Sequence, residues 1–418
     1  MATYRHAKGP SALQIIITVL VVLLSIAILA GAVYAVYHFV IDKEEVQETV
    51  PPTQPATVAT LDEAPTEAET VDPDAIYTEK AQEYIKNMTD DEKIYQMLVV
   101  SPEALTGVDV ATVAGDATKQ AIKTYPVGGI LYDADNFEDA KQTTELIKNS
   151  QSFAKLPMFI AVAEEGGENS PVASKLSTTA FENMSTYTEE GEVTAFNNAA
   201  TIAKDLSKLG FNLNLAPVAN LTGDNAYATD SAVASPLIAQ AVNGMQENSV
   251  IATLKSFPVE SDSDKDADTL RASEFLPFSA GIQNAVGAIM IGNAKLSAID
   301  NDDPAFMSQR IVTELLVKEL KFGGVVISPD LSDTDITSNY SVDEIVTGSL
   351  NAGVNLFLAP QSIDEYVQSI KSALENGTVT QEQIDSSVTK ILALKFKYGI
   401  LTESTTVNAT EAATEDIE

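Results

Sequence analysis

The chain has no cysteine, no tryptophan and only two histidines among its 418 residues. The absence of cysteine excludes disulfides and thiolate metal sites. The absence of tryptophan removes the strongest stacking surface for a sugar ring or a cation, although tyrosine and phenylalanine remain. The histidines, His6 and His38, both precede the predicted globular region. A mechanism in that region therefore cannot use imidazole as an acid, a base or a metal ligand.

Positive charge is also scarce. The chain has 25 basic against 60 acidic residues, which gives a formal net charge of −35. Nucleic-acid phosphates and anionic lipid headgroups would be repelled, so we expect no nucleic-acid partner. Hydrophobic residues make up 45% of the chain, which is enough for a sizeable core in one large domain or two ordinary ones.

Residues 15–41 form a nearly unbroken apolar run. A bilayer crossing needs about 20 residues, so the run can span a membrane with tilt. Arg5 and Lys8 precede it, and the positive-inside rule then predicts a cytoplasmic segment at 1–14, a single-pass anchor in the cell membrane and an extracellular remainder. A cleaved signal peptide is the alternative, which we disfavour because signal h-regions are shorter, roughly 7–15 residues.

Two further segments have the composition of disordered chain. Residues 42–76 are rich in proline, threonine and glutamate, which predicts an extended linker. Residues 403–418 predict a disordered acidic tail. A single folded domain is expected between them, at 77–402.

Within 77–402, apolar strand-like segments alternate with segments of helical period. The strands are expected at Met97–Val100, Gly129–Tyr132, Met158–Ala163, Phe211–Leu215, Val250–Lys255, Ala288–Gly292, Val325–Ser328 and Asn355–Leu358. Amphipathic helices are expected at Glu138–Ala154, Thr194–Leu209, Ser308–Leu320 and Val342–Ala352. Capping-box patterns at Thr89–Glu92, Ser362–Glu365 and Thr380–Gln383 mark further helix starts.

About eight strands alternating with helices predict an α/β fold, a (β/α)8 TIM-type barrel preceded by one N-terminal transmembrane helix. A doubly wound open sheet is the structural alternative. The sequence contains neither of the glycine-rich phosphate-loop patterns that would indicate a nucleotide cofactor.

Several stretches in order resemble the N-terminal barrel of glycoside hydrolase family 3, in its β-N-acetylhexosaminidase branch. They are "NMTDDEKIYQMLVV", "VGGILYDADNFED", "FIAVAEEGG", "LGFNLNLAPVANL", "LKSFP", "AIDNDDPAFMSQRIVTELLVKELKFGGVVISPDL", "LNAGVNLFLAP" and "IDSSVTKILALKFKYGIL". The resemblance extends from Tyr77 to Leu401. It implies a sugar site at the carboxyl ends of the strands, retaining glycosidase chemistry and no cofactor. The implied ligand is an N-acetylglucosamine-containing glycan or a peptidoglycan fragment.

In the resembling family a carboxylate nucleophile directly follows the serine of the seventh strand. That position is Pro329 here, and Asp330 is one residue further on. Successive strand residues face opposite sides, so a one-residue offset normally directs the side chain away from the site. A local bulge could turn it back. Asp330 is therefore the candidate for a displaced nucleophile.

The family's acid/base is a histidine on a loop after the fifth strand. The corresponding stretch, "VESDSDKDADTL" from Val259 to Leu270, contains none. Asp268 is the candidate acid/base, with Glu260 and Asp266 as alternatives if burial raises a carboxyl pKa. The competing interpretation is a solvated acidic loop.

Most implied substrate-holding positions are also altered. Ala163 and Asn220 stand where the family has aspartates, and Glu168 stands where it has an arginine. Ser256 and Asn293 stand where it has histidines. Glu165 and Lys255 remain, either for sugar binding or as a structural ion pair. Lys255 and Asn293 are the candidate substrate-binding residues.

The alternating acids from Asp262 to Asp268 also resemble a calcium loop. That loop needs glycine at its sixth position and glutamate at its twelfth, which here are Ala267 and Ser273. We therefore predict no metal site.

The favoured hypothesis is a membrane-anchored, extracellular barrel of this family that has lost ordinary catalysis and acts as a glycan-binding or scaffold module, with an unknown protein partner. The alternative is an active retaining exo-β-N-acetylglucosaminidase that uses Asp330. A calcium-dependent adhesion module rests only on the acidic run.

Overall fold

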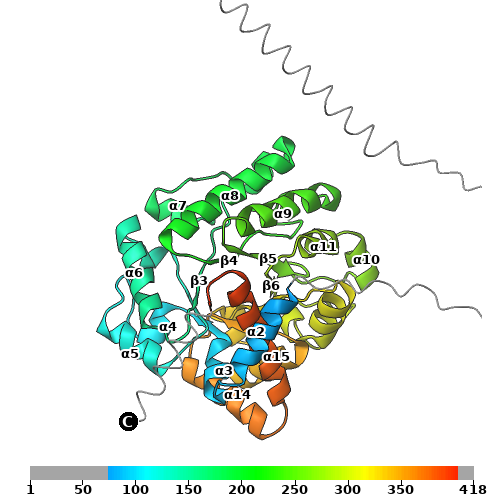
Figure 1. Ribbon diagram of the computed structural model, residues 1–418. Coiled ribbons are helices and arrows are strands. Elements are labelled where there is room, and N and C mark those ends of the chain that lie inside the picture. The colour runs from blue at the N-terminus through cyan, green and yellow to red at the C-terminus, as the bar shows by residue number, and fades with distance from the viewer. Residues whose placement is uncertain (1–73, 403–418) are drawn as a thin grey trace, which may run out of the picture. The chain divides into compact units, whose positions relative to one another are not determined.

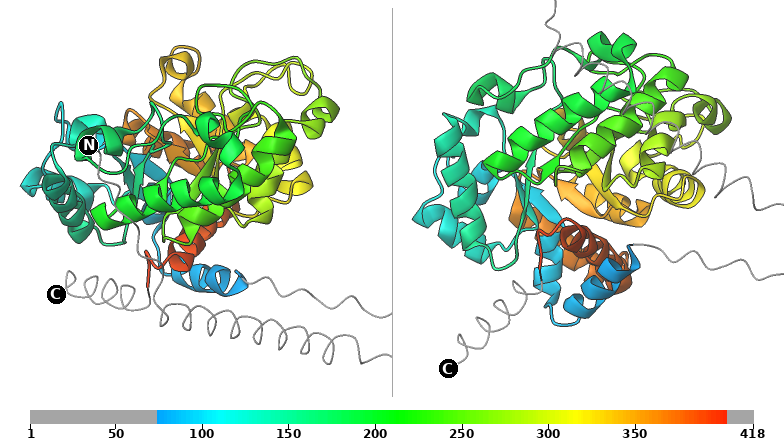
Figure 2. Two further views of the ribbon diagram at one scale, coloured as in Figure 1. Left: turned by 90° about the horizontal axis from the view of Figure 1, so that it is seen from above. Right: turned by 45° about the horizontal axis from the view of Figure 1, so that its top comes forward.

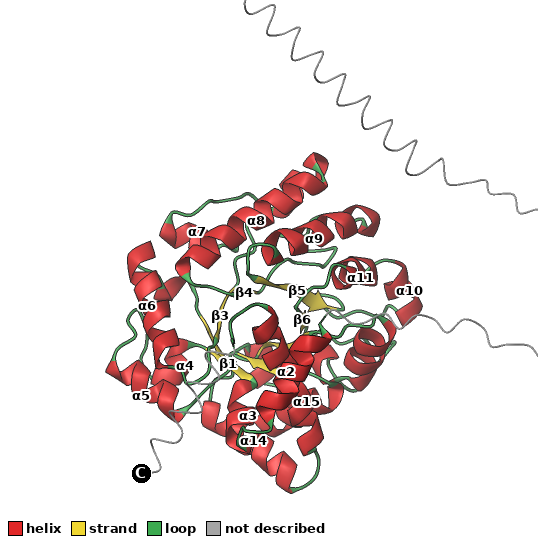
Figure 3. Cartoon of the chain, viewed as in Figure 1, coloured by secondary structure: helices red, strands yellow, loops and turns green. Residues whose placement is uncertain are grey.

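The computed structural model describes residues 74–402. Eight parallel strands form a closed barrel in chain order, and helices surround it (Figures 1 and 3). The strands are β1 Leu98–Val100, β2 Gly129–Leu131, β3 Phe159–Val162, β4 Leu213–Asn214, β5 Ile251–Phe257, β6 Ala288–Ile291, β7 Val325–Asp330 and β8 Leu356–Leu358.

The predicted barrel is confirmed, and the open-sheet alternative is excluded because β1 pairs with β8. Each predicted strand overlaps an observed one. Strands β5 and β7 both continue two residues beyond their predicted ends, to Phe257 and Asp330. The strands are apolar at nearly every position because helices cover one face of the barrel and packed side chains fill the other.

The main helices are α2 Ala75–Ile85, α3 Asp90–Gln96, α4 Pro102–Thr106, α5 Asp116–Thr124, α6 Ala140–Phe153, α7 Pro171–Leu176, α8 Glu192–Leu209, α9 Ser231–Gln246, α10 Ala267–Ala272, α11 Phe275–Gln283, α12 Thr334–Thr337, α13 Val342–Ala352, α14 Ile363–Glu375 and α15 Gln381–Lys397. Within the described residues, the 3₁₀ helices are η2 Ala134–Asn136, η3 Met184–Glu190 and η4 Ala305–Met307, and η5 Arg310–Glu319 is a π-helix.

Three helical details differ from the sequence prediction. Helix α2 begins at Ala75, inside the segment predicted as linker. The segment expected as an α-helix at Ser308–Leu320 forms η5, which has the wider π turn. Ser362 accepts a hydrogen bond from the Glu365 N–H, but the reciprocal half of its predicted capping box is missing. The boxes at Thr89 and Thr380 are complete.

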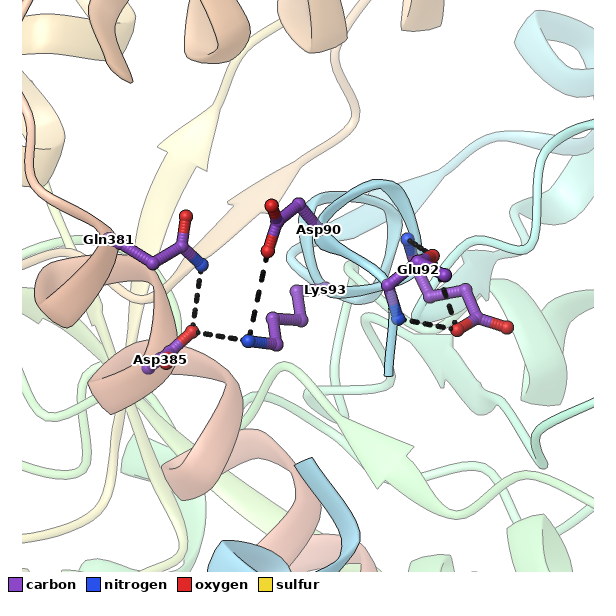
Figure 4. Close-up of polar contacts among 6 residues, drawn as sticks. Asp90, Glu92, Lys93, Gln381 and Asp385 are labelled. Carbon is purple, nitrogen blue, oxygen red and sulfur yellow. Dashed lines mark hydrogen bonds and ion pairs between the residues drawn. The ribbon is translucent and has the colours of Figure 1, made fainter. Parts of the chain in front are cut away.

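The first and last helices of the barrel pack together. Helix α2 lies against α15, as Figures 1 and 2 both show. Helix α3 is tied to α15 by an ion pair of 2.9 Å between Lys93 Nζ and Asp385 Oδ1, and Gln381 donates to the same oxygen (Figure 4). Residues almost 300 positions apart in the sequence are thereby held side by side.

The predicted anchor at 15–41, most of the linker and the tail lie outside the described residues. Within 74–402, no helix is long and apolar enough to cross a membrane.

Lys395, on α15, is fully buried at the amino ends of the strands. Its Nζ donates to Gln96 Oε1 at 2.8 Å and to the Gly128 carbonyl at 2.9 Å, and it lies 4.9 Å from the centre of the Phe159 ring. No carboxylate among the described residues pairs with it, and burial lowers its pKa to about 7.

We predict that Lys395→Met removes a pH dependence of stability. Between pH 7 and 10.5 the unfolded chain binds a proton at Lys395 that the folded chain lacks, so wild-type stability should rise with pH over this window. The free energy of unfolding of the wild type should gain on that of the variant by on the order of 1 kcal/mol per pH unit. Urea unfolding from pH 6.5 to 9.5 measures the difference. Lys148→Met, at an exposed lysine, is the control, and equal pH profiles for all three proteins would contradict the prediction.

Candidate functional site

A polar pocket of about 450 Å³ lies at the carboxyl ends of β3 to β6. It is lined by Glu165, Glu168, Asn169, Asn183, Val218, Asn220, Thr222, Gly223, Asp224, Asn225, Lys255, Ser256, Glu260 and Met290. Four of these residues are acidic and one is basic, and no described residue of the pocket is a histidine.

An ion pair between Glu165 and Lys255 organises this pocket. The two side chains are 8% and 14% exposed, and Lys255 Nζ lies 2.5 Å from Glu165 Oε1. The Asn225 amide donates to Glu165 Oε2 at 2.9 Å and to the Gly166 carbonyl at 2.8 Å. Asn169 donates to the other carboxylate oxygen. The pair therefore joins the end of β5 to the loops that follow β3 and β4.

Asn220 fixes the backbone next to Lys255. Its Oδ1 accepts the Ser256 N–H at 2.7 Å, and its Nδ2 donates to the Ser256 carbonyl at 2.9 Å. The Lys255–Ser256 peptide bond is cis. One amide side chain therefore bonds both backbone polar groups of Ser256, and the N–H is not left for a ligand.

Glu164 is a buried carboxylate beside the pocket, and its role is structural. Its oxygens accept the N–H groups of Val172 and Ala173 at 2.7 and 3.2 Å, at the first turn of α7. Its own backbone N–H and carbonyl are both bonded by the Asn214 amide at 2.8 Å. Burial raises the pKa of Glu164 to about 7.

Strand β7 carries a bulge at its end. Ile327 pairs with Leu356 but Asp330 pairs with Leu358, so β7 has one residue more than β8 over this stretch. Pro329 is buried and Asp330 is exposed. Asp330 Oδ1 accepts the N–H and the hydroxyl of Ser332 at 2.8 and 2.6 Å. Neither Pro329 nor Asp330 lines the polar pocket.

The acidic loop divides its carboxylates among separate partners. Asp268, the predicted acid/base, is 90% exposed on α10 and pairs with Arg271 at 2.5 Å. Asp266 caps the same helix by accepting the Thr269 N–H at 2.8 Å, and Asp262 accepts the Lys295 N–H at 2.7 Å. Residues 74–402 contain no group of three or more histidine, cysteine, aspartate or glutamate side chains that could hold a metal ion.

Glu260 is the carboxylate of this loop that lines the pocket. Burial and the nearby negative charges of Glu165 and Asp224 raise its pKa, and Lys255 opposes the rise. From the sequence, Asp268 is the predicted acid/base and Glu260 is only an alternative to it. The signal that could have favoured it is its position, directly after the strand that carries Lys255.

The two predicted substrate-binding residues lie in different cavities. Lys255 lines the polar pocket, whereas Asn293 lines a neighbouring cavity of about 520 Å³ together with Asp262, Lys295, Asp335 and Tyr340. Glu260 lines both cavities. Asp224, Asn225 and Asn183 were not predicted, since nothing in their local sequence marks them as pocket residues.

The fold and the pocket define a (β/α)8 barrel with a polar site at the carboxyl ends of its strands. The sequence profile described as "Glycosyl hydrolase family 3 N terminal domain" matches residues 89–394. The chain therefore belongs to glycosyl hydrolase family 3, through that family's N-terminal domain.

Curated relatives carry glycosidase names. "Beta-hexosaminidase A" of Pseudoalteromonas piscicida is 28% identical over 326 residues, which cover 66% of this chain and 54% of that protein. "Beta-hexosaminidase LpqI" of Mycobacterium tuberculosis is 25% identical over 338 residues, which cover 73% of this chain and 82% of that protein. The chain thus spans about half the length of the Pseudoalteromonas relative.

Solved structures share the fold. A family 3 β-N-acetylglucosaminidase from Paenibacillus sp. superposes with a TM-score of 0.69 at 24% identity, covering 77% of this chain and 68% of that one.

We predict that Glu165→Gln destabilises the barrel by about 3 kcal/mol, because removing one partner of a buried pair leaves Lys255 without a counter-charge. Urea unfolding at pH 7 measures the loss. The matched control is Glu83→Gln, which breaks an exposed pair with Lys86 on α2 and should cost less than about 1 kcal/mol. Equal losses in the two variants would mean that the buried pair has no special weight.

Proposed function

We propose that this chain is a family 3 barrel that binds an N-acetylglucosamine-containing glycan or a peptidoglycan fragment in the polar pocket and does not hydrolyse it at an ordinary rate. We further propose that residues 15–41 anchor it in the cell membrane with the barrel outside. The family, and the hexosaminidase names of its relatives, support the ligand class. The anchor rests on the apolar run in the sequence.

The observation that carries the loss of catalysis is Pro329. Retaining hydrolysis needs a carboxylate that attacks the anomeric carbon and a second group that transfers protons. The last residue but one of strand β7 is Pro329, which is buried. By the resemblance of the sequence, this is the position of the nucleophile in the family. No histidine occurs in the acidic loop or elsewhere in residues 74–402.

The pocket retains groups suited to holding a sugar. Amides of Asn169, Asn183 and Asn225 provide donors and acceptors, and the Glu168, Asp224 and Glu260 carboxylates accept hydrogen bonds from hydroxyl groups. None of these three carboxylate side chains has a hydrogen-bond partner among the described residues. Bonds from sugar hydroxyls would satisfy them.

The second candidate function is a hydrolase with a displaced nucleophile, and the bulge in β7 favours it. In a regular strand, the one-residue offset would direct Asp330 to the face opposite that of the residue before it. Because the bulge pairs Asp330 with Leu358, Asp330 is returned to the face that the preceding position would otherwise occupy. In this candidate Glu260 replaces Asp268 as the acid, since Glu260 lines the pocket and its pKa is raised.

A turnover assay separates the two candidates. With an aryl β-N-acetylglucosaminide, we expect no turnover above background from the wild type, from Asp330→Ala or from Pro329→Asp. The proline variant restores a carboxylate but not a proton donor, and general acid–base assistance alone contributes about 10²–10⁴-fold. Robust wild-type turnover that Asp330→Ala abolishes, and that the exposed-carboxylate control Asp116→Ala retains, would establish the second candidate instead.

A binding assay tests the pocket. We predict that Glu260→Ala weakens muropeptide binding about tenfold, since a hydrogen bond to a charged group contributes about 1.5–3 kcal/mol. Asp268→Ala, in the same loop but paired with Arg271 outside the pocket, should leave the affinity unchanged. Isothermal titration calorimetry measures both. Undetectable binding by the wild type, or an equal loss in the two variants, would contradict a glycan site at this pocket.

A further inference from the structure

A third cavity, of about 380 Å³, lies at the opposite, amino ends of β6 and β7. Its walls come from the start of α2, the turn between α11 and β6, the turn between η5 and β7, and the last turns of α15. Neither the pocket around Lys255 nor the proposed sugar chemistry involves these elements.

Lysines gather around this cavity. Lys321, Lys390 and Lys397 line it, and Asp74 is the one carboxylate among the described residues that line it. Lys397 pairs with Asp74 at 2.7 Å. Lys390 is partly buried, and its ammonium group has no hydrogen bond or ion pair with any described residue. Burial without a counter-charge lowers its pKa. Local positive charge therefore exceeds local negative charge, in a chain with 60 acids and 25 bases.

The turn before β7 lines the same cavity and contains two backbone donors, at Gly323 and Gly324. The N–H groups of Gly323 and Gly324 have no acceptor among the described residues. Lys321 takes a left-handed φ of 59°, which sets the turn. A Cβ on Gly324 would lie 2.6 Å from the Gly287 carbonyl oxygen, so only glycine fits there. Consecutive free N–H groups beside ammonium groups are a recurring arrangement for binding anions.

Apolar side chains complete the walls. Val286, Phe322 and Leu394 are buried and line the cavity. They exclude water from part of it, and low polarity strengthens the attraction between an ammonium group and an anion. A small oxyanion would give Lys390 the counter-charge that it lacks and would accept the two glycine N–H groups.

We propose that this cavity binds a small oxyanion, a phosphate or carboxylate group, held by Lys390, Lys321 and the N–H groups of Gly323 and Gly324. The site is independent of the sugar pocket. Charged oxygens accept both kinds of donor with charge-assisted bonds. The group can belong to a soluble metabolite or to a lipid headgroup, and these sources share the same recognition chemistry.

The test uses the full chain and inorganic phosphate as the probe, with isothermal titration calorimetry at constant ionic strength. We expect saturable binding that weakens at least tenfold in Lys390→Met, which keeps an unbranched apolar side chain but removes its charge. Gly323→Leu is the second variant. A Cβ at Gly323 meets no atom within 4 Å, so a larger side chain can obstruct the turn without a backbone clash. Lys148→Met, at an exposed lysine of α6, is the control.

The source of the anion is distinguished by flotation with phosphatidylglycerol and phosphatidylcholine vesicles. Additional flotation with phosphatidylglycerol that Lys390→Met abolishes would assign a lipid headgroup. Phosphate binding without such flotation would assign a soluble anion. Absence of phosphate binding together with absence of Lys390-dependent flotation, or equal affinity in Lys390→Met and Lys148→Met, would overturn the proposal. Unchanged phosphate binding in Glu260→Ala is expected, because the two sites share no lining residue.

Discussion

The ion pair between Glu165 and Lys255 is the constraint on which the mouth of the barrel depends. It joins the loop after β3 to the end of β5, and both charges are almost fully withdrawn from water. Two charges in such a place are tolerated only when they are paired and hydrogen-bonded. Lys255 and Glu165 pair with each other, and Asn169 and Asn225 donate further hydrogen bonds to Glu165. The same Glu165 charge helps raise the pKa of Glu260, so the pair also sets the electrostatics of the loop beside it.

Pro329 shows how a proline can lie within a barrel strand without breaking the sheet. Proline cannot donate to a β-ladder, and it is confined to edges, strand ends and bulges. Here it sits in a bulge. The Ser328 hydroxyl accepts the Leu358 N–H at 2.9 Å and donates to the Pro329 carbonyl at 2.8 Å. The Ser328 side chain therefore bonds a backbone N–H and a backbone carbonyl beside the bulge. The barrel therefore closes between β7 and β8 without needing a carboxylate at this position.

The barrel was predictable because its signal is repeated and local. Apolar runs of strand length alternate with capped helices, as at Thr89 and Thr380, and both patterns follow from burial and hydrogen bonding within a few residues. The site was harder to predict. In the acidic loop, Glu260 and Asp268 are chemically similar, and only the course of the loop decides that one lines the pocket and the other pairs with Arg271. Asn293 likewise follows a barrel strand, but it lines the adjoining cavity and not the polar pocket.

The net charge of −35 is a sum over the whole chain, and the two ends of the barrel differ from each other in local charge. Among the described charged residues, acids outnumber bases in the pocket at the carboxyl ends of the strands, and lysines outnumber acids in the cavity at the amino ends. In the polar pocket, burial and the neighbouring carboxylates of Glu165 and Asp224 raise the pKa of Glu260. At the amino ends of the strands, Lys390 is desolvated without a counter-ion and Lys395 is buried among carbonyl groups and a ring. Long-range repulsion between the chain and a polyanion falls off within about 10 Å in 0.1 M salt, whereas a short-range contact in a desolvated cavity is screened much less. The composition therefore argues against extended polyanions such as nucleic acid, but it does not decide what a single lysine-lined cavity can hold.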